Sequence, residues 1–135
     1  MANAFLPLVT GLLIYLTKAE RTYITDLLHA LRTILPVIRY PHIIRAFACD
    51  FLWTYSLFFC LRLALGDSLK GKHNLTVITV TVIAALLLET IQIFKVIPGT
   101  FDPMDIAAEI SATAVALLIT TIIERRFNHY EENIA

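Results

Sequence analysis

Acidic and amide side chains gather in the second half of the chain, at spacings that place them on common helix faces. Glu89 and Gln92 lie three residues apart, and a further run of acids follows at intervals of three and four. Residues three or four apart face the same side of a helix. Carboxylates and an amide can accept hydrogen bonds from a bound group, carry a proton, or hold Mg²⁺ or Ca²⁺. The candidate site residues are therefore Asp50, Glu89, Gln92, Asp102, Asp105 and Glu109.

The composition of the 135-residue chain is that of a protein embedded in a lipid bilayer. Hydrophobic residues make up 58% of it and charged residues 16%, and the formal net charge is zero, unlike a soluble globular domain. No basic run with interleaved aromatics occurs, which argues against a nucleic-acid partner. Acidic side chains at membrane depth are costly, so each is a candidate for function. Cys49 and Cys60 lack metal-binding or redox spacing and are interpreted as buried small side chains.

We expect a single all-α membrane domain with about four transmembrane helices. Apolar segments near the ~20 residues needed to cross a bilayer predict spans at residues 2–17, 46–65, 75–94 and 104–123. Between the first two spans, residues 22–38 carry apolar side chains at helical spacing with polar ones among them. This pattern predicts an amphipathic helix flat on the membrane interface, either as a connector or as a lid over the acidic site.

The predicted second span carries polar residues near both ends. Asp50 lies one turn inside its start, with Trp53 and Thr54 three and four residues on, so all three lie toward one face. Trp53 and Tyr55 could instead be anchors at the membrane interface, a common position for aromatic residues near a span end. Arg62, near the other end, is expected to reach outward to the head groups.

The predicted fourth span has a strong start signal and a stripe of small residues. Asp102 suits the N-cap of a helix and Pro103 suits its first position. Ala112 and Ala116 lie four residues apart, on the stripe that also carries Glu109. Small residues at this spacing allow helices to approach closely in lipid. The charged C-terminal residues are expected to lie in water.

The direction of the spans predicts that the acids meet. If consecutive spans alternate, the start of the second, the end of the third and the start of the fourth share one membrane face. Asp50, Glu89 and Glu109 then lie at similar depth, about one to one and a half turns from that face. The sequence therefore predicts one polar cluster near one side of the membrane.

Three motifs on consecutive predicted spans match the order and spacing of a known family: Asp-x-x-x-x-Tyr at Asp50, Glu-x-x-Gln at Glu89 and Asp-x-x-Asp at Asp102. Over residues 46–120 the chain resembles the VanZ-like family of small bacterial membrane proteins. The resemblance implies a helical, multi-pass protein of the bacterial plasma membrane, and some members are associated with low-level resistance to the glycopeptide teicoplanin. Family members often have Arg where this chain has Gly99 and Asn where it has Glu109.

The residues leave several functions open. In the first, the acidic cluster binds a lipid or glycopeptide head group or a cation, and the protein modulates glycopeptide sensitivity. The partner is then a membrane lipid, an envelope precursor or the glycopeptide. Alternatively the cluster binds nothing, and Glu89, Gln92 and Arg45 satisfy one another across helices.

In the second function the chain is a small proton-coupled transporter, as a homo-oligomer, with Glu89 as the proton carrier. An enzyme is the least favoured reading, because no nucleophile with a base, no HExxH and no paired His occurs. An enzyme would have to use carboxylates and a metal. No catalytic residue and no cofactor are predicted.

Overall fold

The computed structural model of the chain describes residues 1–18, 27–65, 74–94 and 102–132. Within these residues the protein is helical and has no β-strand. The helices are α1 (Ala2–Thr17), α3 (His29–Ile34), α4 (Cys49–Ala64), α5 (Asn74–Ile93) and α6 (Pro103–Glu132), with a π-helical turn, η1 (Ile44–Ala48), directly before α4.

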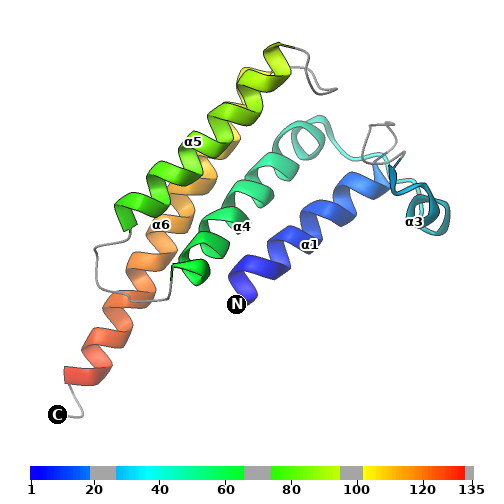
Figure 1. Ribbon diagram of the computed structural model, residues 1–135. Coiled ribbons are helices and arrows are strands. Elements are labelled where there is room, and N and C mark those ends of the chain that lie inside the picture. Colours follow the sequence, from blue (N-terminus) through cyan, green and yellow to red (C-terminus); the bar gives the residue numbers. More distant parts are fainter. Residues whose placement is uncertain (19–26, 66–73, 95–101, 133–135) are drawn as a thin grey trace.

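The four long helices lie side by side and alternate in direction (Figure 1). Helix α1 packs against α4, and α4 packs in turn against α5 and α6, which also contact each other. The N-terminal end of α4, the C-terminal end of α5 and the N-terminal end of α6 therefore meet at one end of the bundle. This is the arrangement that brings the predicted acidic residues into one region.

Two of the described helices are long and apolar enough to cross a membrane, Asn74–Ile93 and Pro103–Arg126. Their outer faces expose large apolar side chains, with Leu87 55%, Ile110 60% and Leu118 60% exposed. The exposure of such a large apolar surface to water is unfavourable in free energy. Helix α1 is also apolar but shorter, with the bounds predicted for the first span.

The amphipathic helix is shorter at its C-terminal end than predicted. Residues 22–26 lie outside the described part of the chain, and α3 ends at Ile34 rather than at residue 38. Leu35 is already extended, with φ −89° and ψ 143°, because the ring of Pro36 disfavours helical geometry in the preceding residue. The backbone N–H of Ile38 then donates to the Thr17 carbonyl at 2.8 Å, which ties this segment to the end of α1.

The second predicted span contains a feature that its sequence does not indicate. Helical backbone begins at residue 42, passes through the π-helical turn Ile44–Ala48 and continues as α4 to Ala64. A π-helical turn takes up extra backbone and rotates the face presented by the helix that follows, and such turns are frequent at functional sites. The turn ends two residues before Asp50, so it sets where that carboxylate points.

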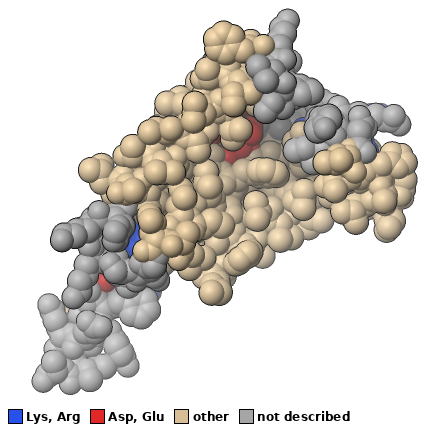
Figure 2. Space-filling model, viewed as in Figure 1, with Lys and Arg blue, Asp and Glu red and all other residues tan. Residues whose placement is uncertain are grey.

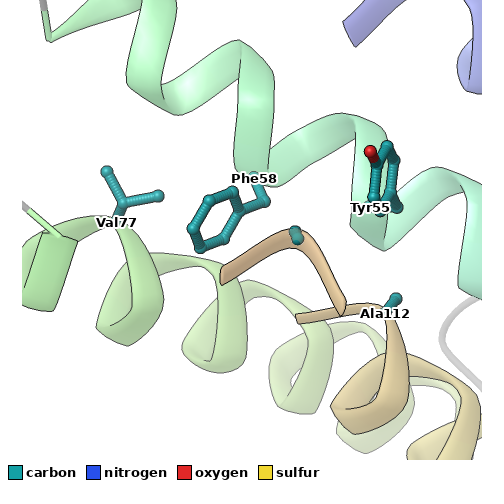
Figure 3. Packing of buried hydrophobic residues seen from close by; sticks show 5 residues of the cluster. Tyr55, Phe58, Val77 and Ala112 are labelled. Carbon is teal, nitrogen blue, oxygen red and sulfur yellow. The ribbon is translucent and has the colours of Figure 1, made fainter. Parts of the chain in front are cut away.

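The apolar core lies where α4 crosses α5 and α6 (Figure 3). Phe58 of α4 is fully buried, between Val77 of α5 and the α6 alanines. Ala112 and Ala116 are both 0% exposed, because an alanine lets the α4 backbone and its aromatic side chains approach α6 closely. The small-residue stripe predicted on this helix is thus a packing face.

A polar contact at the opposite end of the bundle corrects the prediction made for Arg62. Arg62 does not reach outward but is 9% exposed. Its Nη2 donates to Glu124 Oε1 at 3.0 Å, and its Nη1 donates to Asn74 Oδ1 at 2.9 Å. Beyond Glu124, helix α6 continues to Glu132, past the predicted end of the fourth span. Pairing explains the burial of Arg62, since a buried guanidinium needs a charged partner.

Candidate functional site

Carboxylates from three helices meet at the end of the bundle where α4 and α6 begin. They are Asp50 of α4, Glu89 of α5, and Asp105 and Glu109 of α6, and we call them the acidic cluster. The side chains of Asp50 and Asp105 act directly on each other. The charge of Glu89 acts on both Asp50 and Glu109. Residues that are 55 positions apart in the sequence, Asp50 and Asp105, are thus neighbours in space.

The other two predicted site residues lie at the edge of the acidic cluster. The Oδ1 atom of Asp102 accepts a hydrogen bond from the Met104 backbone N–H at 3.0 Å, so Asp102 is the N-cap predicted for α6. Its charge still acts on Glu89 and Asp105. Gln92 lies one turn beyond Glu89 in α5 and is half-buried.

The two glutamates of the acidic cluster are the most deeply buried of its members. Glu89 is 4% exposed and Glu109 is 7% exposed. The Oε2 atom of each has no hydrogen-bond partner among the described residues. A buried polar atom without a partner costs about 1–3 kcal/mol, more for a charged group, so these oxygens are placed to meet a proton or a bound donor.

Among the described residues, positive charge near the acidic cluster comes from one side. Lys18, at the end of α1, acts on Asp50, while its Nζ lies 4.0 Å from the ring centroid of Tyr15. The charges that act on Glu89 and Glu109 within the described part of the chain are those of other carboxylates. The predicted pairing of Glu89 with Arg45 falls on a side chain that the structure does not describe.

The acidic cluster does not have the spacing of a metal centre. Among the described residues, no group of three or more His, Cys, Asp or Glu side chains is placed to hold a metal ion. A Ca²⁺ site needs six to eight oxygens at about 2.3–2.6 Å. Acids that interact through their charges without converging on such a point suit separate protons or a larger, organic cation.

A groove of about 340 Å³ runs along α4 from the acidic cluster, and we call it the lateral groove. Asp50 and Glu109 lie in its wall, and Figure 2 shows acidic surface in a hollow on an otherwise largely uncharged face. The rest of its lining is mainly apolar and comes from α1, α4 and α5: Leu8, Trp53, Leu57, Cys60, Ala85 and Leu88.

The aromatic residues near Asp50 take different roles. Trp53 lines the lateral groove together with Asp50 and Thr54, as their predicted common face requires. Tyr55 is 8% exposed and belongs to the apolar core, so it is not an interfacial anchor. Trp53 also packs against Gly11 of α1. Gly11 is not among the residues predicted from the sequence, although a lone glycine inside an apolar helix is a signal of close packing.

Comparison of the chain with protein-family models, with curated proteins and with solved structures gives no match. The class of protein is defined by its own geometry: a helical bundle with two helices able to cross a membrane and an acidic cluster buried between helices.

Proposed function

We propose that this chain is a multi-pass protein of the bacterial plasma membrane whose acidic cluster binds the ammonium head group of a membrane-borne ligand. In this proposal α1, α4, α5 and α6 all span the bilayer, as the four predicted spans require. The helical run through η1 and α4, residues 42–64, extends about 34 Å at 1.5 Å per residue. That length is sufficient for a hydrocarbon core of about 30 Å.

The buried Oε2 atoms of Glu89 and Glu109 carry the proposal. Adjacent carboxylates in a low-dielectric interior repel one another unless a proton or a cation lies among them. Within the described part of the chain, Lys18 acts on Asp50, and the charges that act on Glu89 and Glu109 are negative. A bound ammonium group would add positive charge on the other side and donate hydrogen bonds, or present polarised C–H groups, to both glutamates.

Two observations favour an organic cation over a compact metal ion. The carboxylates do not converge as metal ligands within the described residues. Trp53 lines the same groove as Asp50 and Glu109, and an indole attracts ammonium groups through the negative face of its ring. A diffuse cation can therefore contact several of these groups without the short, fixed distances that a metal demands.

Thermal unfolding of the detergent-solubilised protein tests the proposal, with tetramethylammonium chloride as the probe. A ligand that binds only the folded protein raises its stability with concentration. Tetramethylammonium should therefore raise the unfolding temperature above that in sodium chloride of equal ionic strength. Glu109→Gln keeps the shape of the side chain but removes its charge, and it should abolish this difference.

Glu124→Gln is the matched control for that experiment. Glu124 lies in the same helix as Glu109, about 22 Å further along at 1.5 Å per residue. The control makes the same change in net charge, and it lowers the starting stability by weakening the contact with Arg62, but the response to tetramethylammonium should persist. Equal stabilisation of the parent by sodium and tetramethylammonium would refute the proposed head-group site.

The depth of Glu89 also favours a second candidate, the proton-coupled transporter. At 4% exposure with an unpartnered Oε2, Glu89 can be neutralised by a proton alone, with no ligand present. Uptake of a substrate into vesicles that is driven by a proton gradient, and that Glu89→Gln abolishes, would favour this function. The head-group proposal instead requires ligand binding in the absence of any gradient.

The resemblance to VanZ-like proteins extends the proposal to the cell envelope. A protein that captures ammonium-bearing molecules at one membrane face could change the sensitivity of the cell to a glycopeptide. A strain that lacks the chain should then differ in teicoplanin sensitivity from the same strain complemented with the parent sequence. Complementation with Glu89→Gln should leave the strain like the deletion.

A further inference from the structure

The lateral groove has the proportions of a site for an alkyl chain. Along α4 its lining extends from Asp50 to Cys60, about 15 Å at 1.5 Å per residue. The hydrocarbon core of a bilayer is about 30 Å thick, so the groove is as long as one leaflet is deep. Its volume is about 340 Å³.

The charged residues of the lining lie at one end of the groove. Asp50 and Glu109 lie at the end of the bundle where the acidic cluster is, and Leu57 and Cys60 lie further along α4. Ser56 also lines it, but its hydroxyl donates to the Ala4 carbonyl and so is already satisfied. The groove therefore has one anionic end and one apolar end. The anionic end suits the cationic head group of an amphiphile, and the apolar end suits its alkyl chain.

We propose that the ligand of the acidic cluster is a single-chain cationic amphiphile, with its ammonium group beside Glu109 of the acidic cluster and its alkyl chain along α4 in the lateral groove. This inference rests on the proposed head-group function and adds the ligand class. The unpartnered Oε2 of Glu109, whose residue is 7% exposed and lines the groove, points to a charged occupant rather than to bulk lipid. Bulk lipid would fill the apolar part equally well but would leave this oxygen without a partner.

The only tryptophan of the chain, Trp53, reports directly on this groove because it lines it. A bromine atom on an alkyl chain quenches tryptophan emission on contact. The full-length protein is reconstituted in vesicles of an uncharged glycolipid, which offer no ammonium group. An alkyltrimethylammonium brominated in mid-chain is then compared with an uncharged alcohol of the same brominated chain, at equal mole fraction in the membrane.

We expect the cationic probe to quench Trp53 more strongly than the uncharged probe. Glu109→Gln should remove this excess, and so should an excess of tetramethylammonium, which competes for the acidic end. Glu89→Gln supplies a second variant of the acidic end, and thermal unfolding of each variant shows that it is folded.

Two neighbouring leucines provide a matched pair for the apolar part. Leu88 lines the lateral groove and Leu87 does not appear in its lining, and the two are 53% and 55% exposed. Leu88→Phe narrows the groove and should reduce the excess quenching, while Leu87→Phe should leave it unchanged. An excess that survives Leu88→Phe in full would place the chain outside the groove and overturn the inference.

The outcomes separate this inference from the function on which it rests. If both probes quench equally while tetramethylammonium still raises the unfolding temperature through Glu109, the head-group site stands and the amphiphile does not. If both probes quench equally and tetramethylammonium has no effect, both proposals fail. Excess quenching by the cationic probe that depends on Glu109 and Leu88 supports both.

Discussion

Replacing Gly11 by alanine tests how closely α1 packs on α4 beside the lateral groove. A Cβ atom at this position would lie 2.7 Å from Trp53 Cδ1 and 2.8 Å from Trp53 Nε1, with Leu52 Cβ at 3.4 Å. Non-bonded carbon atoms are most stable about 3.5–4.0 Å apart. The indole must therefore move by about 0.8 Å or more, or α1 must move away from α4.

Two effects of opposite sign determine the stability of Gly11→Ala. Overpacking of a close contact costs about 1–3 kcal/mol, while alanine gains about 1 kcal/mol over glycine in a helix interior. The net expectation is a loss of up to about 2 kcal/mol in the free energy of unfolding. Because Trp53 is the side chain displaced, its emission should also shift.

A double-mutant cycle with Trp53→Ala isolates the contact. Without the indole, Gly11→Ala should stabilise the protein by up to about 1 kcal/mol, so the two substitutions should be coupled by about 1–3 kcal/mol. Denaturant unfolding in detergent of the parent, both single variants and the double variant measures this coupling. The packing argument is refuted if Gly11→Ala changes stability equally in both backgrounds and leaves the Trp53 emission of the parent background unaltered.

Three further substitutions test other parts of the fold and site. Ala112→Leu places a larger side chain at a position that is 0% exposed and should lower the free energy of unfolding by about 1–3 kcal/mol. The control Ala107→Leu, on the exposed face, should have little effect. Equal shifts in unfolding temperature would show that the Ala112 side of α6 is not its packing face. Arg62→Met leaves Glu124 without its guanidinium partner and should lower the free energy of unfolding by about 3 kcal/mol. Adding Glu124→Gln should recover part of that loss. No recovery would mean that the broken ion pair is not the cause of the loss. Glu89→Gln should unfold at or above the temperature of the parent yet lose stabilisation by tetramethylammonium, and a variant that keeps the full response would exclude Glu89 from the site.

Several features of the fold follow from local sequence. The apolar composition and its helical segments predict the helices, and the bounds of α1 and α5 agree with the prediction to within a residue. The start of α6 is set by Asp102 and Pro103, whose capping and fixed φ act within one turn. The alternation of long helices then brings their acidic ends together, which connectivity alone makes predictable.

Other features depend on which helices touch. From the sequence, an arginine near a helix end can extend to the head groups or form an ion pair. Arg62 forms the ion pair because the packing of α4 on α6 places Glu124 beside it. The π-helical turn Ile44–Ala48 carries no sequence signal of the kind that a cap or a proline provides. Helix α6 likewise extends beyond the predicted span, to Glu132.

For the site, too, part of the chemistry is predictable from the sequence and part depends on the tertiary structure. Residue types and helical spacing predict which acids are candidates for a site, because carboxylates are costly in an apolar chain wherever they lie. Spacing did not show that Glu89 and Glu109 are the buried ones, that Asp102 is used as a cap, or that a groove leads from the acids along α4. Burial and cavities are properties of several helices packed together, and the distance between side chains on different helices is set by that packing rather than by any local pattern.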